Sequence, residues 1–149
     1  MIAQIANGGY KIKPSFNAND QFLIGEKIIQ SDDHLKFIQD ALNVATNEWR
    51  GTSYRSRLKG DLKYCGKTGT SQVRKITQEQ RELNIKNKDL PWKYRDHSLF
   101  TGYGPVSNPK YAISVIIDHG GSGSSKAAPI SKKIMSKVFE LYYPKGKNA

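Results

Sequence analysis

The sequence has almost no cysteine. Cys65 is the only one in 149 residues. A single cysteine forms no disulfide within the chain and supplies no cysteine-based zinc site. We predict that Cys65 is a small buried residue, with a catalytic thiol as the less favoured alternative. Cysteine content therefore leaves the redox compartment undecided.

Long apolar runs are also missing. The longest, residues 111–117, is interrupted by Ser114 and is far shorter than the roughly 20 residues that span a bilayer. The first residues lack the basic segment and cleavage site of a signal peptide. No targeting or transmembrane segment is therefore expected in this chain. Taken alone, it predicts a cytoplasmic protein, and this prediction fails if the chain is part of a longer one.

Acidic residues are scarce. There are 13 Asp and Glu against 24 Lys and Arg, a formal net charge of +11. Such a charge favours nucleic acid, anionic lipid head groups or acidic wall polymers. The basic residues are spread along the chain, and the densest stretch, residues 50–63, is mixed with Ser, Thr and Tyr. We therefore favour a solvated basic surface over a dedicated polyanion site.

Three helices are predicted in this single domain's length of chain. The first covers residues 1–7 and ends at two glycines. The second is capped by Ser31, has acidic residues in its first turn, and ends within residues 47–51. The third begins at Pro129. The second helix carries an apolar stripe expected to face the core, formed by Leu35, Ile38, Leu42 and Ala45 and widened by Phe37, Ala41 and Val44.

The remaining segments predict strands and loops. Extended segments are expected at residues 10–12, 22–29 (a short hairpin), 62–73, 98–103 and 111–118. Residues 75–95 look like an inserted loop with a short helix over 78–86, and residues 144–149 like a loose tail. Strands grouped between helices predict an α/β fold of the α+β type, an antiparallel sheet flanked by helices.

The sharpest motif is Lys67-Thr68-Gly69-Thr70, within a predicted strand. A strand glycine lets a ligand approach the backbone closely, and the flanking hydroxyls and the lysine suit a carboxylate. Such a strand could pair with an extended peptide. A phosphate-binding loop ending in Gly66-Lys67-Thr68 is the rival. Five residues separate Gly60 from Gly66, however, where that motif has four.

Further motifs follow in a fixed order, and together with the Lys-Thr-Gly-Thr strand they resemble class B penicillin-binding proteins, most closely the penicillin-binding protein 2 group. The matching segments are Ala6-Asn7-Gly8-Gly9, Gly51-Thr52, Thr70-Ser71-Gln72-Val73, Asp96-His97-Ser98-Leu99-Phe100, Tyr103-Gly104-Pro105, Asp118-His119-Gly120-Gly121-Ser122-Gly123 and Ala127-Ala128-Pro129-Ile130. The resemblance implies the C-terminal portion of the β-lactamase-like transpeptidase fold.

The resemblance also implies a peptidoglycan D,D-transpeptidase that cross-links the cell wall by acyl transfer through a serine. Lys67, Thr68, Gly69 and Thr70 would hold the D-Ala-D-Ala stem peptide or a β-lactam, and the Thr70 N–H would donate to the oxyanion. No cofactor or metal is implied. The parent protein would be anchored in the bacterial inner membrane with this domain in the periplasm.

The chain departs from the family in its nucleophile. Two Ser-x-x-Lys strings, Ser56 to Lys59 and Ser107 to Lys110, lie in a basic loop and a proline-containing turn, and Ser15-Phe16-Asn17 is out of order. We interpret all three as coincidences. The chain is then half an active site, inactive alone, with the catalytic serine upstream and no catalytic residue of its own.

The resemblance also predicts partners, and two other functions remain as alternatives. The upstream half of the domain is an expected partner, and its absence predicts self-association through exposed or swapped elements. His34 is expected at the surface, His97 and His119 are expected to position a strand or loop, and Trp49 and Trp92 are candidates for the core or an interface. The alternative function is a non-catalytic basic module for nucleic acid or wall polymer, although no nucleic-acid motif accompanies the charge. A nucleotide phosphate binder is the third.

Overall fold

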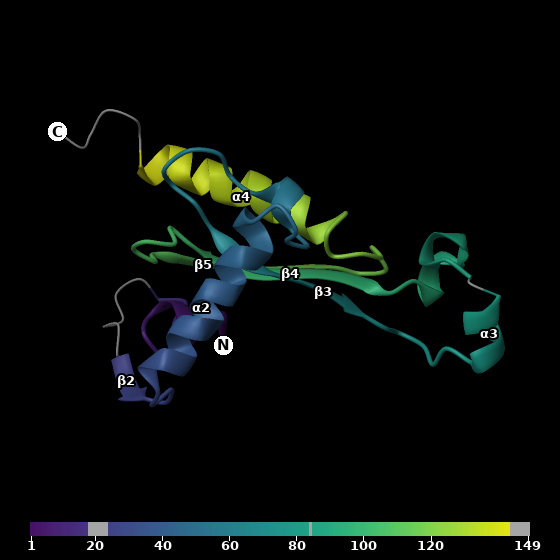
Figure 1. Ribbon diagram of the computed structural model, residues 1–149, viewed down its shortest axis with the longest axis horizontal. Helices are drawn as coiled ribbons and strands as arrows, with labels where there is room; N and C mark the ends of the chain where they lie inside the picture. Colours follow the sequence, from purple (N-terminus) through teal and green to yellow (C-terminus); the bar gives the residue numbers. More distant parts are fainter. Residues whose placement is uncertain (18–23, 84, 144–149) are drawn as a thin grey trace.

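A three-stranded antiparallel sheet with helices on both faces forms the centre of the molecule (Figure 1). The computed structural model describes residues 1–17, 24–83 and 85–143. Within them, β3 (Cys65–Ser71) pairs with β4 (His97–Gly104), which pairs with β5 (Tyr111–Ile117). The predicted antiparallel sheet flanked by helices is confirmed. The first two residues of the predicted hairpin and the tail 144–149 lie outside the described residues.

The larger core lies between the sheet and α4 (Ala127–Tyr142). Side chains alternate across a strand, so Phe100 on β4 and Ile113 on β5 point toward α4. Met135 and Phe139 meet them from the helix, and Tyr64 fills the space beside Phe100, with the ring centroids 5.8 Å apart. Burying each such side chain contributes about 1.5–3 kcal/mol.

The opposite face of the sheet is covered by α1 (Ile2–Ala6) and α2 (Asp32–Asn47), where Ile2, Cys65 and Tyr103 form a smaller core. The predicted cap of α2 is confirmed, because Ser31 Oγ accepts the His34 N–H at 3.2 Å. The predicted width of its buried stripe is wrong. Leu35 is buried, but Phe37 is 75% exposed and Val44 52% exposed.

The third helix begins earlier than predicted, at Ala127 rather than Pro129. Ser98 on β4 explains the difference. Its hydroxyl accepts the Ala127 N–H at 3.0 Å and donates to the Ser122 carbonyl at 3.0 Å. A cap supplied from a distant strand leaves no local sequence signal. Pro129 then occupies the first turn, where its missing N–H costs nothing.

Residues 72–83 and 85–96 project from the end of the sheet, on the right in Figure 1. They contain α3 (Gln78–Glu82) and two 3-10 helices, η2 (Asn87–Asp89) and η3 (Trp92–Tyr94). The helix is shorter than the predicted 78–86, and β3 is shorter than the predicted 62–73 at both ends.

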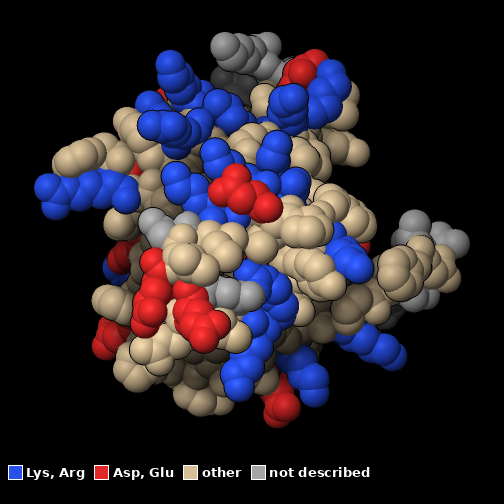
Figure 2. All heavy atoms as spheres, turned by 90° about the vertical axis from the view of Figure 1, so that its right-hand side faces the viewer, with Lys and Arg blue, Asp and Glu red and all other residues tan. Residues whose placement is uncertain are grey.

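Basic side chains are distributed over much of the surface. Figure 2 shows Lys and Arg across one face, with acidic residues among them and a concentration of basic residues at its upper end. That end is level with α4 in Figure 1, because the two views differ by a turn about the vertical axis. The predicted dispersed basic surface therefore has one denser region.

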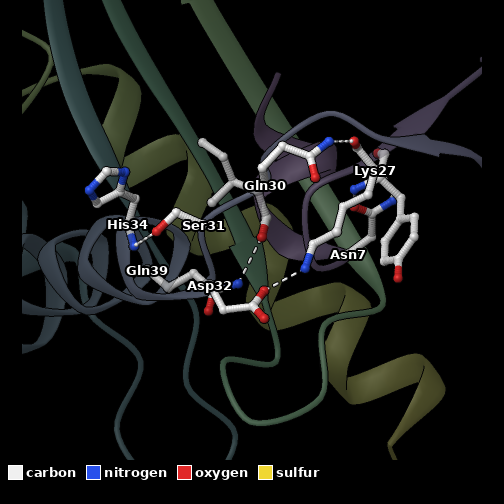
Figure 3. Close-up of polar contacts among 9 residues, drawn as sticks. Asn7, Lys27, Gln30, Ser31, Asp32, His34 and Gln39 are labelled. Carbon is white, nitrogen blue, oxygen red and sulfur yellow. Dashed lines mark hydrogen bonds and ion pairs between the residues drawn. The ribbon is translucent and has the colours of Figure 1, made fainter.

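A small two-stranded sheet, β1 (Tyr10–Ile12) with β2 (Ile24–Lys27), joins α1 to α2. Figure 3 shows the polar contacts of this junction. Lys27 Nζ forms an ion pair with Asp32 at 2.5 Å, and Gln39 Nε2 donates to the Ile5 carbonyl at 2.7 Å. The first contact joins β2 to the start of α2, and the second joins α1 to α2.

The second half of α2 holds β3 through Thr46, which is fully buried. Its hydroxyl accepts the Gly66 N–H and donates to the Gly66 carbonyl, both at 3.0 Å. Asn47 Nδ2 donates to the Tyr64 carbonyl at 3.0 Å. These side chains satisfy backbone groups at the outer edge of β3 that no strand of the described chain pairs with.

We predict that Thr46→Val lowers the free energy of unfolding by about 2–4 kcal/mol, because it leaves both Gly66 backbone groups buried without partners. Urea denaturation followed by circular dichroism measures the change. Thr70→Val is the matched control, since Thr70 is exposed, and should change stability by less than about 0.5 kcal/mol. Equal effects of the two variants would contradict this role of Thr46.

Candidate functional site

The four motif residues lie together on β3, at the edge of the sheet. Thr68 pairs with Phe100, whose side chain points to α4, so Thr68 and Thr70 lie on the α4 side. Lys67 and Gly69 lie on the side of α1 and α2. A ligand lying along this edge would therefore meet the lysine on one side and the two hydroxyls on the other.

The backbone of β3 offers donors at its outer edge. The Gly66 N–H points away from β4, since it donates to Thr46. In an antiparallel ladder, amides two residues apart point the same way. The N–H groups of Thr68 and Thr70 therefore also point outward. The predicted oxyanion role of the Thr70 N–H stays a prediction, but its direction suits that role.

Two side-chain contacts position the motif. Lys67 Nζ donates to the Thr68 carbonyl at 2.9 Å, which holds the ammonium group beside the outer edge. The Thr68 hydroxyl donates to Thr52 Oγ1 at 3.1 Å. In the sequence, Thr52 stands out only as part of the Gly51-Thr52 segment of the family resemblance. Its contact to Thr68, 16 residues away in the sequence, could not be inferred from spacing.

The loop after β5 supports the motif from behind. A Cβ atom on Gly123 would lie 2.4 Å from the backbone oxygens of both Gly69 and Leu99. Such a distance is far inside van der Waals contact, so only glycine lets this loop approach β3 so closely. The glycine- and serine-rich segment 120–125 thus sets the position of Gly69.

The serine candidates lie elsewhere. Ser56 is buried in η1 (Tyr54–Ser56), where its carbonyl accepts the Tyr64 hydroxyl at 2.8 Å, and Lys59 is exposed. Ser107 lies exposed in the turn between β4 and β5. Ser15 lies between β1 and the undescribed residues 18–23. The described residues contain no hydrogen bond that joins Ser56 to Lys59 or Ser107 to Lys110.

Two histidines meet at the base of the projecting segment. His97 Nδ1 accepts the His119 N–H at 3.0 Å and lies 3.4 Å from Asp118 Oδ1. His119 adopts a φ of 54°, in the left-handed region, and packs against the edge of Trp92 at 4.3 Å between ring centroids. These contacts shape the loop. Over the described residues, no three His, Cys, Asp or Glu side chains are grouped to hold a metal.

Cys65 begins β3 and is completely enclosed beside Tyr103. Burial raises the pKa of the Cys65 thiol from 9.0 to about 11. A nucleophilic cysteine needs a lowered pKa and access to solvent, and Cys65 has neither. The predicted buried residue is therefore confirmed, and the catalytic thiol is not supported.

The raised thiol pKa predicts a loss of stability at high pH. The unfolded thiol releases its proton near pH 9 while the folded thiol keeps it, so the unfolded state binds fewer protons. Stability present below pH 9 should then fall by about 1–2 kcal/mol by about pH 10.5. Urea denaturation across this range should give a shallower fall for Cys65→Ala than for the unchanged chain. Identical pH slopes would contradict the burial argument.

Comparison with known proteins agrees with this geometry. The sequence model of the penicillin binding protein transpeptidase domain matches residues 1–136. The chain is 34% identical over 103 residues to the peptidoglycan D,D-transpeptidase MrdA of Salmonella typhimurium, covering 69% of this chain and 16% of that protein. It is 34% identical over 98 residues to MrdA of Haemophilus influenzae, covering 66% of this chain and 15% of that protein.

Solved structures share the fold. The penicillin-binding protein PBP2 of Helicobacter pylori, in its complex with MreC, superposes with a TM-score of 0.78 at 27% identity, over 95% of this chain and 24% of that one. PBP2 of Pseudomonas aeruginosa, in complex with WCK 5153, gives 0.67 at 24% identity, over 93% of this chain and 28% of that one. The chain thus spans between 15% and 28% of the length of these four relatives. The resemblance seen in the ordered motifs is confirmed, and the chain belongs to the penicillin-binding protein transpeptidase domain family.

Proposed function

We propose that this chain works as part of a penicillin-binding peptidoglycan D,D-transpeptidase of the penicillin-binding protein 2 type. Its contribution is the strand that holds the donor peptide or a β-lactam. The observation that carries the proposal is the edge of β3, where the Thr68 and Thr70 amides point outward beside the Lys67 ammonium. The MrdA relatives of Salmonella typhimurium and Haemophilus influenzae are peptidoglycan D,D-transpeptidases.

The chemistry of this edge suits acyl transfer from a peptide. An extended peptide ending in D-Ala-D-Ala adds to an open strand edge by main-chain hydrogen bonds. The terminal carboxylate is then held by Lys67 and by the Thr68 and Thr70 hydroxyls, since charge-assisted bonds are the strongest available. The Thr70 N–H would donate to the oxyanion that forms as the serine attacks. Gly69 leaves room for the peptide backbone.

The remaining catalytic groups would come from the rest of the parent protein. We propose that the described segment is a single partial domain, that residues 75–95 are an insertion in it, and that the nucleophilic serine lies upstream. The exposed Phe37 and Val44 on α2 offer an apolar surface for that upstream part. In its absence, the same surface and the open edge of β3 support self-association.

The location of the parent protein is also a proposal. No helix in the described ranges has both the length and the apolar character needed to cross a bilayer. We propose that the parent is anchored in the inner membrane by another segment and that this domain lies in the periplasm, where the wall is cross-linked. One PBP2 relative was solved in complex with MreC, so a protein of the MreC type is a proposed partner of the parent.

Titration of the 15N-labelled chain with diacetyl-Lys-D-Ala-D-Ala tests the binding role. We expect amide shifts centred on residues 68–70, since the peptide pairs with these outward N–H groups. Lys67→Gln should weaken binding by about tenfold, the effect of losing one charge-assisted bond. The all-L peptide is the matched ligand control. Shifts spread over the surface, or equal for both peptides, would contradict the assignment.

Intact mass spectrometry after incubation with benzylpenicillin separately tests the proposal that the nucleophilic serine lies upstream. No penicilloyl adduct should form, because Ser56 is buried and, within the described chain, neither Ser56 nor Ser107 is hydrogen-bonded to the lysine of its Ser-x-x-Lys string. A stoichiometric adduct would place the nucleophile within these residues. Mapping it to Ser56 or Ser107 would then overturn the upstream position of the serine while leaving the family intact.

A further inference from the structure

A hollow of about 920 Å³ lies between the connection that follows α2 and the outer face of α4. Trp49 and Arg55 belong to the first wall and Lys132 and Lys133 to the second. The hollow shares Thr52 with the site on β3, yet its chemistry differs from that of an extended peptide edge. Ser53 and Ser56, which are both buried, are among the residues that line it.

One face of α4 is devoted to this hollow. The helix contributes positions 129, 132, 133, 136, 137 and 140, which follow the i, i+3, i+4, i+7 repeat of a single face. Its buried residues, such as Ser131, Met135 and Phe139, lie on a different face and pack on the sheet. The lysines are therefore held in place by a helix that the core fixes.

The positive charge in the hollow is uncompensated. Its one acidic wall residue, Glu140, pairs with Lys137 at 2.6 Å. Across the described parts of the chain, Arg55, Lys132 and Lys133 form no ion pair and no side-chain hydrogen bond. Figure 2 shows basic side chains gathered at the upper end of the molecular face that it displays, level with α4.

The lysines of the hollow do not stabilise α4 by their charge. A helix macrodipole favours cations in the last turn, where α4 has none. Lys133 and Lys137 are four residues apart, a spacing at which like charges destabilise a helix. The N-terminal amides of α4 are also occupied, by Ser98 Oγ and by the Gly123 carbonyl. A ligand in the hollow would therefore be held by side chains and not by the helix terminus.

Hydroxyl groups complete the set of donors. Thr52 Oγ1 accepts from Thr68 and so keeps its own hydrogen for a ligand. Ser136 faces the hollow between the lysines of α4. Two or three ammonium and guanidinium groups with two hydroxyls match the three oxygens and near-double negative charge of a phosphate group better than the two oxygens of a carboxylate.

We propose that this hollow is a binding site for a phosphate-bearing ligand, with Lys132, Lys133 and Arg55 as its charge partners. The source of the phosphate is either a free phosphorylated molecule or the head group of an anionic lipid. Occupation would reach the β3 edge through Thr52, because the Thr52 hydroxyl that faces the ligand also accepts from Thr68. The phosphate site would exist whether or not β3 binds a peptide, although Thr52 connects the two.

Calorimetric titration with inorganic pyrophosphate at low salt tests the proposal, alongside sedimentation with phosphatidylcholine vesicles containing phosphatidic acid. The double variant Lys132→Gln/Lys133→Gln should weaken binding by about tenfold or more. The double variant Lys11→Gln/Lys13→Gln removes the same charge from exposed positions near β1 and should change affinity by less than about twofold. The Thr68 amide signal should shift on binding.

Pyrophosphate binding with this pattern identifies a free phosphate ligand, and vesicle binding alone with the same pattern identifies a lipid head group. Equal weakening by the two double variants would show only long-range charge attraction and would overturn the proposal. The proposal would also be overturned if tricarballylate, an anion that carries carboxylates and no phosphate, bound as tightly as pyrophosphate. The absence of binding in both assays would overturn it as well. Circular dichroism of each variant confirms that it is folded.

Discussion

Thr46 joins α2 to the outer edge of β3 by accepting the Gly66 N–H and donating to the Gly66 carbonyl. An edge strand normally leaves such groups open to any partner. Here one buried hydroxyl closes the edge at Gly66, and the following residues emerge from beneath α2. The position of the motif residues, the outward direction of the Thr68 and Thr70 amides, and the contact to Thr52 all depend on this attachment.

Support on the other sides makes the edge rigid. The Gly123 backbone lies against Gly69, and Ser98 ties the same loop to β4 and to the start of α4. Strand β4 is held on both faces, by α4 and by α1, and α2 holds the neighbouring strand β3. A binding edge built on such a scaffold keeps its donors in fixed positions, which a preorganised site requires. The helices therefore position the binding edge as well as forming the core.

Local patterns in the sequence predicted what local physics decides. The Ser31 cap, the amphipathic final helix and the glycine-containing strand were all evident from spacing. The attachment of Thr46 to Gly66 spans 20 residues and the cap from Ser98 to Ala127 spans 29, so neither leaves a periodic signal. The predicted apolar stripe of α2 is wider than the buried one, because the spacing of apolar residues does not reveal how much of a helix the rest of the fold covers. The charged hollow likewise arises from two segments about 80 residues apart in the sequence.

Amide hydrogen exchange of β3, followed by NMR at a concentration where the chain is monomeric, tests the central claim most directly. The Gly66, Lys67 and Gly69 amides should be protected, the first by Thr46 and the others by β4. The Thr68 and Thr70 amides, which point outward, should exchange about 100-fold faster or more. Equal protection of all five amides in the monomer would mean that the edge is already covered, and would contradict its role as an open peptide-binding strand.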